Sequence, residues 1–140
     1  MIRSVDSNAA VALLGNSFDT KQGIIIEGIL RLPKAKDSSR CGVYIECTNN
    51  LGVGLLIDST GVAELCPMKA DGTGFKAEKR VDREMTFRSP AVFRLLVKGS
   101  LTEFYLDDIL IESFALPANA TGRIGLINAE DTMGTLKAWN

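Results

Sequence analysis

One stretch, residues 92–114, constrains the fold of this chain more than any other part. Its apolar and polar residues alternate, and two polar pairs, Gly99-Ser100 and Asp107-Asp108, interrupt the alternation. Two-residue polar breaks between alternating runs are the strongest short-range sign of a β-hairpin. The stretch therefore predicts three antiparallel strands joined by two tight turns.

The two turns also predict which residues lie opposite each other. The first turn places Leu95 opposite Phe104, and the second places Phe104 opposite Ile111. Together with the residues two positions away on each strand, these side chains form one nearly all-apolar face. Because side chains alternate between the two faces of a strand, we expect this face to belong to the core.

The opposite face of the same strands mixes charged, aromatic and apolar residues. In this register Arg94 lies opposite Tyr105, and Glu103 lies opposite Glu112. Like charges across a strand pair are destabilising unless a basic neighbour, a cation or a hydroxyl-rich ligand compensates. Carboxylates and a guanidinium bind sugar hydroxyls through several hydrogen bonds, and an aromatic ring packs on the apolar face of a sugar. These four residues are therefore the candidate carbohydrate-binding site; the alternative is a solvated face on which Arg94 bridges the acids.

The rest of the chain also favours strands, because a two-residue period dominates it. Gly23–Leu32 carries apolar residues on both faces, as expected for a strand with neighbours on both sides. The charged run 75–87 predicts one or two edge strands, since Lys and Arg protect edges from aggregation. About nine to eleven strands with frequent turns predict an all-β fold, a two-sheet antiparallel β-sandwich of the jelly-roll type.

Length and charge limit the partners of the chain. Its 140 residues suit a single domain over 1–140. The net charge is −1 and no basic cluster occurs, so neither nucleic acid nor a membrane is an expected partner.

The apolar run 9–14 is too short for a secretory signal or a membrane span, so we expect no targeting segment. The localisation stays open between a cytosolic protein and a domain cut from a longer secreted or periplasmic protein.

Residue types that commonly perform catalysis or bind metals are scarce. The chain has no histidine and three cysteines. Cys41 and Cys47 are too far apart on one predicted strand to bond each other, and although either could reach Cys66, we favour buried free thiols.

The turns 58–61 and 71–74 offer oxygen ligands to Ca²⁺ but lack the acidic density of a dedicated loop, and Asp and Gly are ordinary turn formers. We expect no cofactor, with Ca²⁺ as an open alternative.

Residues 97–108, Val-Lys-Gly-Ser-Leu-Thr-Glu-Phe-Tyr-Leu-Asp-Asp, resemble a motif of the C-terminal β-sandwich of family 32 glycoside hydrolases. That family includes invertases, levanases and fructanases, and its motif is similar to V-D-x-S-x-V-E-V-F-x-N-D. Ser100, Glu103 and Asp108 match the motif. Tyr105 stands where the family has Phe, and Lys98 stands where it usually has Asp.

A second stretch, residues 121–127 (Thr-Gly-Arg-Ile-Gly-Leu-Ile), looks like a strand common in concanavalin A-like lectins and glucanases. The two resemblances imply a concanavalin A-like jelly roll of the kind appended to a catalytic β-propeller. They imply a non-catalytic carbohydrate-binding or accessory module, with fructan as a candidate ligand and a catalytic domain of the same parent chain as a partner. The alternative is a structural module that packs against such a propeller.

Catalysis by this chain is a third and less favoured alternative. Glucanases of this fold use an E-x-D-x-x-E strand, which places the acid and the nucleophile on one face about 5.5 Å apart. That pattern is absent from the sequence. Glu103 and Glu112, opposed across two predicted strands, come nearest to a catalytic carboxylate pair.

Overall fold

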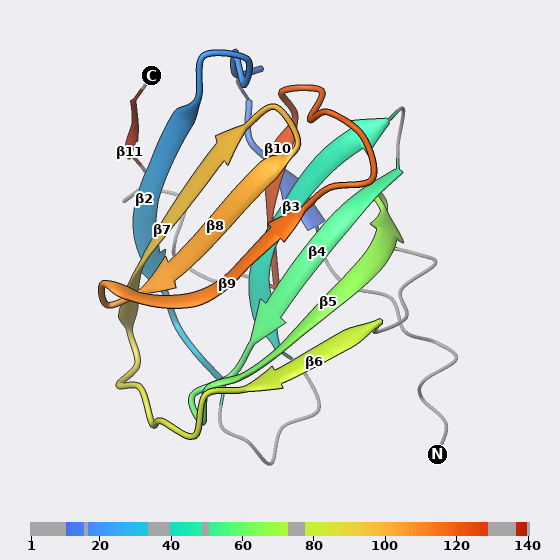
Figure 1. Ribbon diagram of the computed structural model, residues 1–140. Helices are drawn as coiled ribbons and strands as arrows, with labels where there is room; N and C mark the ends of the chain where they lie inside the picture. The colour runs from blue at the N-terminus through green and yellow to red at the C-terminus, as the bar shows by residue number, and fades with distance from the viewer. Residues whose placement is uncertain are drawn as a thin grey trace.

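The computed structural model describes residues 11–15, 17–33, 40–48, 51–72 and 78–128, together with the backbone of 137–139. These residues form two antiparallel sheets packed face to face (Figure 1). Sheet A contains, in spatial order, β1 (Val11–Leu13), β10 (Ile124–Ile127), β3 (Cys41–Thr48), β4 (Leu51–Ile57), β5 (Val62–Lys69) and β6 (Lys79–Asp82). Sheet B contains β11 (Lys137–Trp139), β2 (Ile24–Leu30), β7 (Ala91–Lys98), β8 (Leu101–Leu106) and β9 (Ile109–Ala115). The predicted all-β sandwich is confirmed, and the described residues include no helix that could cross a membrane.

The main core lies between the two sheets. Sheet B contributes Phe93 and Phe104, whose rings stack with their centroids 6.1 Å apart. Sheet A contributes Val43 and Leu55 from its two central strands, and both are fully buried. The strand of residues 24–30, predicted to have neighbours on both sides, lies between β11 and β7. The edge strand predicted within residues 75–87 is β6.

The hairpin of β7 and β8 has the predicted register. Leu95 lies opposite Phe104, and Arg94 lies opposite Tyr105. At the next turn, Asp107 and Asp108 both have positive φ, 50° and 67°. Two consecutive residues in this left-handed region are what a type I′ turn requires, and Asp tolerates it better than most residues.

The hairpin of β8 and β9 departs from the predicted register. Tyr105 lies opposite Leu110, but the register then shifts at a β-bulge, so Phe104 lies opposite Glu112 rather than Ile111. A bulge inserts one extra residue in one strand and therefore changes the face of every later residue. Ser113 lies opposite Glu103 on the outer face. The prediction that Glu112 shares the outer face with Glu103 is wrong.

An ionic contact between the two sheets explains where the bulge occurs. Glu112 faces inward, with its side chain 9% exposed, and the Lys79 ammonium lies 2.8 Å from its Oε2 atom. A guanidinium nitrogen of Arg83 lies 3.9 Å from Oε1, and Arg83 Nε donates a 2.8 Å hydrogen bond to the carbonyl of Ile111. The bulge thus turns a carboxylate toward Lys79 in β6 and Arg83 just after it, and ties the edge strands β6 and β9 together.

The three cysteines are buried and free, as predicted. Cys41 and Cys47 lie in the core between the sheets, whereas Cys66 lies among buried side chains on the outer face of sheet A. Sheet A therefore separates Cys66 from the other two. Burial raises the pKa of Cys41 and of Cys66 to about 12, so both remain neutral thiols near pH 7.

Candidate functional site

The outer face of sheet B brings together three of the four predicted site residues. Arg94 on β7 lies directly opposite Tyr105 on β8, and Glu103 lies two residues before Tyr105 on the same face. All three are partly exposed. Glu112 does not join them, because it lies on the inner face and pairs with Lys79.

Arg94 is held in place by three neighbours. Its guanidinium carbon lies 5.5 Å from the centroid of the Tyr105 ring, within range of a cation–π contact. It forms an ion pair with Asp108 in the turn after β8, and its Nε atom lies 3.9 Å from Glu27 Oε2 on β2. A guanidinium already held in one position loses less conformational entropy when it binds a ligand.

Tyr105 connects Arg94 to Glu103. The Tyr105 hydroxyl donates a 3.0 Å hydrogen bond to Glu103 Oε1. This hydrogen bond favours the neutral phenol, and together with the nearby carboxylate charge it raises the pKa of Tyr105. Within the described part of the chain Glu103 has no ion pair, so its other oxygen remains available to accept a hydrogen bond. We call Glu27, Arg94, Glu103, Tyr105 and Asp108 the polar row.

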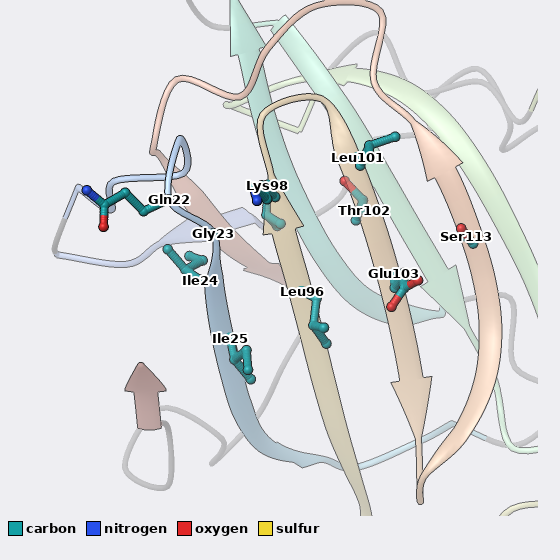
Figure 2. Close-up of a pocket in the computed structure, with 11 residues that line it drawn as sticks. Gln22, Gly23, Ile24, Ile25, Leu96, Lys98, Leu101, Thr102, Glu103 and Ser113 are labelled. Carbon is teal, nitrogen blue, oxygen red and sulfur yellow. The ribbon is translucent and has the colours of Figure 1, made fainter. Parts of the chain in front are cut away.

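A hollow of about 450 Å³ adjoins the polar row at the end of β7 and the start of β8 (Figure 2). Ile25, Leu96 and Leu101 give it an aliphatic lining, and Glu103 belongs both to the hollow and to the polar row. Leu101 is 64% exposed. A concave surface with an apolar lining and a few polar groups is the usual form of a small-molecule site.

Sequence reasoning missed Glu27 and the hollow. Both depend on the pairing of β2 with β7, which places Glu27 opposite Arg94 and Ile25 opposite Leu96. The two strands are far apart in the sequence, so no turn sets their register. One signal was present, because Glu27 is the only charged residue within the apolar run 24–30. A lone carboxylate there suggests a cationic neighbour on the next strand.

The outer face of sheet A is of a different kind. Five side chains on it form a cluster in which none is more than 3% exposed, and we call it the sheet A cluster: Tyr44, Leu56, Cys66, Met68 and Ile127. Gly54 leaves the space that two of them fill, since a Cβ atom there would lie 2.3 Å from Met68 Sδ and 2.9 Å from Ile127 Cδ1. The Tyr44 hydroxyl is buried and has no hydrogen-bond partner among the described residues. The two polar groups of this cluster, the Tyr44 hydroxyl and the Cys66 thiol, are buried, so the cluster offers no polar group to a ligand from solvent.

The Asp58 turn, an alternative site for Ca²⁺, uses its carboxylate internally. Asp58 Oδ1 accepts hydrogen bonds from the Thr60 amide and hydroxyl at 2.9 and 2.6 Å, and Arg40 Nε lies 3.1 Å from Oδ2. Burial opposes ionisation of Asp58, but these hydrogen bonds and the Arg40 charge outweigh it and hold its pKa below the usual range. The turn 71–74 lies partly outside the described residues. Those residues contain no group of three or more His, Cys, Asp or Glu side chains that could hold a metal ion.

Comparison with known proteins gives matches in structure only. No family model matches the chain, and no curated protein has a significantly similar sequence. The carbohydrate-binding module CBM66 from Bacillus subtilis superposes with a TM-score of 0.62 at 12% identity, over 96% of this chain and 80% of that one. A doubly substituted human galectin-16 superposes with a TM-score of 0.65 at 10% identity, over 92% and 94% of the two chains.

A third match is a galectin from another organism. Xenopus laevis galectin-Ib superposes with a TM-score of 0.56 at 14% identity, over 93% of this chain and all of that one (100%). At such low identities a structural match establishes the fold and not the activity. The chain therefore has the predicted two-sheet jelly-roll fold, which it shares with CBM66 and the galectins.

Proposed function

We propose that this chain is a carbohydrate-binding module and that its sugar-binding surface is the outer face of sheet B. The observation that carries the proposal is the polar row. A guanidinium, a carboxylate oxygen and an aromatic ring lie together on two paired strands, where the backbone fixes their spacing. Sites built on rigid strands hold such groups more accurately than sites built on loops.

Each group has a distinct part in binding. Arg94 donates hydrogen bonds to sugar oxygens, and Glu103 accepts hydrogen bonds from sugar hydroxyls through the oxygen that Tyr105 does not use. Tyr105 contributes apolar contact with ring C–H groups beside the guanidinium. Glu103 and Arg94 are charged, so their hydrogen bonds to hydroxyls are stronger than those between neutral groups.

Two lines of support lead to carbohydrate rather than another ligand. The names of the structural neighbours include a carbohydrate-binding module and several galectins. The motif at residues 97–108, which resembles family 32 glycoside hydrolases, supplies Glu103, Tyr105 and Asp108 of the polar row. The finer proposal rests on that motif alone: an accessory module of a glycoside hydrolase, with fructan as ligand and a catalytic domain as partner.

A second candidate function has its own observation. Four large apolar side chains on the same face are exposed, namely Ile25 at 36%, Val92 at 45%, Leu101 at 64% and Leu110 at 40%. A module that packs against a catalytic propeller would cover them. The glycosidase alternative loses its carboxylate pair, because Glu103 and Glu112 lie on opposite faces of sheet B.

A glycan array that includes fructans, followed by calorimetric titration of the retained glycans, tests the proposed function. We expect Glu103→Ala and Arg94→Ala each to weaken binding at least tenfold, since each removes a charge-assisted hydrogen bond. Two exposed residues away from the polar row provide matched controls, Glu78→Ala and Arg80→Ala, which should bind as the unsubstituted protein does. Unchanged folding is checked by circular dichroism and thermal melting. Retention of no glycan, or equal affinity of all four variants, would show that the surface is not a sugar site.

A further inference from the structure

The hollow and the polar row are neighbouring parts of one surface. Ile25, Leu96 and Glu103 lie opposite one another across β2, β7 and β8, and Figure 2 shows Leu96 between the other two. Two residues along each strand, the next set of cross-strand neighbours on the same face is Glu27, Arg94 and Tyr105, which all belong to the polar row. Residues two positions apart on one strand lie about 7 Å from each other on the same face. A sugar bound at Arg94 and Tyr105 would therefore have its substituents at the hollow.

The lining of the hollow suits an alkyl group better than a sugar ring. None of the described residues that line it is aromatic, and Leu101 is the most exposed of its large apolar side chains. Sugar rings generally pack on aromatic faces, whereas an aliphatic chain gains free energy on any apolar surface in proportion to the area buried. The Tyr105 ring lies in the polar row, outside the hollow.

The charges beside the hollow indicate a neutral ligand. Among the described residues two charged side chains line it, Lys98 and Glu103, and they have opposite signs. No ion pair in the described part of the chain joins Lys98 to a carboxylate, so its ammonium remains available to donate hydrogen bonds. With one donor of positive charge and one acceptor of negative charge, the hollow has no net charge to select an ion, and both groups can bind hydroxyls.

We propose that the hollow is a subsite for an alkyl or acyl group carried by the sugar, so that the preferred ligand is a neutral glycoside or sugar ester with an aliphatic substituent. This inference rests on the proposed sugar-binding function of the polar row. The sugar contacts Arg94, Glu103 and Tyr105, and the aliphatic chain lies on Ile25, Leu96 and Leu101.

The test uses pairs of probes that differ only in chain length: methyl and hexyl glycosides of glucose, galactose, mannose and fructose, below their micelle concentrations. Binding is measured by calorimetric titration and by amide chemical-shift changes. Each methylene that leaves water on an apolar surface increases affinity about fourfold. With partial burial of the five added methylenes, we expect the hexyl compound of the preferred sugar to bind at least twentyfold more tightly than its methyl partner.

Two leucine variants locate the effect. Leu101→Asn should remove most of the gain from the hexyl chain and leave the methyl glycoside unaffected. Leu110→Asn is the matched control, because Leu110 is an exposed leucine on the same face of sheet B but does not line the hollow. It should retain the full gain.

Several results would overturn this inference. Equal affinity for hexyl and methyl partners, with Arg94 and Glu103 still required for binding, would refute the alkyl subsite and leave the sugar site intact. Binding of 1-hexanol as tight as that of hexyl glycosides would refute the link to the sugar. Dimerisation in sedimentation experiments that Leu101→Asn abolishes, with no chain-length effect, would assign the hollow to a second copy of the chain instead.

Discussion

The two tyrosines of this chain lie on the outer faces of different sheets and have opposite surroundings. Tyr44 on sheet A is fully buried, and no residue that the structure describes forms a hydrogen bond with its hydroxyl. Tyr105 on sheet B is partly exposed, and its hydroxyl donates to Glu103 while its ring contacts Arg94. Outward orientation from a sandwich therefore does not by itself identify a binding surface. The partners of a side chain distinguish a stabilising face from a face that can bind a ligand.

The same contrast holds for the residues around each tyrosine. Tyr44 packs within the sheet A cluster, which acts as a second small core on the outside of that sheet. Tyr105 lies between charged side chains that are held by one another but remain reachable from solvent. We therefore expect substitutions on the outer face of sheet A to change stability and substitutions on the outer face of sheet B to change binding.

The largest expected effect comes from removing the buried tyrosine. Tyr44→Ala should lower the free energy of unfolding by about 3–5 kcal/mol, because it deletes a large buried ring and leaves a cavity. Tyr105→Ala should leave the unfolding midpoint nearly unchanged and weaken glycan binding. Urea denaturation followed by circular dichroism measures the first effect, and calorimetric titration measures the second. Similar losses of stability in the two variants would remove the distinction between the faces.

A smaller effect compares two glutamates of neighbouring strands. Glu112→Gln should destabilise the fold by about 1–2 kcal/mol, because it removes the charge that Lys79 and Arg83 share between the sheets. The exposure of Lys79, 57% of its side chain, keeps this cost below that of a fully buried pair. Glu103→Gln should leave the free energy of unfolding unchanged and weaken binding. The expectation fails if Glu112→Gln reduces glycan affinity while the urea midpoint stays constant.

These two glutamates also show how far the sequence predicts the structure. The register of β7 and β8 follows from a tight turn and strict alternation, so the positions of Arg94 and Tyr105 were predictable. The bulge in β9 is not encoded by a local turn residue. It provides partners for Glu112, namely Lys79 in β6 of the other sheet and Arg83 just after that strand. Such a tertiary contact overrides the alternating pattern.

The same reasoning explains which parts of the candidate site could not be predicted from the sequence. Local signals place Glu103 and Tyr105 on one strand and Arg94 on the next. Glu27 and Ile25 join them only through the pairing of β2 with β7, and no short loop sets that register. The outward apolar residues Leu96 and Leu101 were visible in the sequence, but their grouping into a hollow depends on that pairing.

A stabilising substitution provides a third comparison. Tyr44→Phe should raise the free energy of unfolding by about 1 kcal/mol at neutral pH, since it removes a buried hydroxyl without a partner and keeps the ring. The gain should widen in alkali. Burial, followed by the Glu46 charge, raises the pKa of Tyr44, so its contribution to stability is complete below the unfolded pKa of about 10 and declines above it. Urea denaturation of both proteins at pH 7 and pH 10.5 measures the difference, and a loss of stability on substitution would indicate an undetected partner.

The smallest expected effect concerns the ionisation of Tyr105 alone. In a Tyr44→Phe background, Tyr105 is the one tyrosine left in the chain, so absorbance near 295 nm reports its titration directly. The hydrogen bond to Glu103 holds the proton on the phenol and raises the pKa of Tyr105. Glu103→Gln removes the carboxylate charge and weakens that hydrogen bond, so the titration midpoint should move down toward the ordinary value of about 10. A bound sugar whose hydroxyls donate hydrogen bonds to Glu103 should weaken the Tyr105–Glu103 hydrogen bond and lower the midpoint in the same direction, which joins this measurement to the proposed function. An unchanged midpoint in the Glu103→Gln protein would show that the phenol and the carboxylate do not interact in solution, and the polar row would lose the link between Arg94 and Glu103.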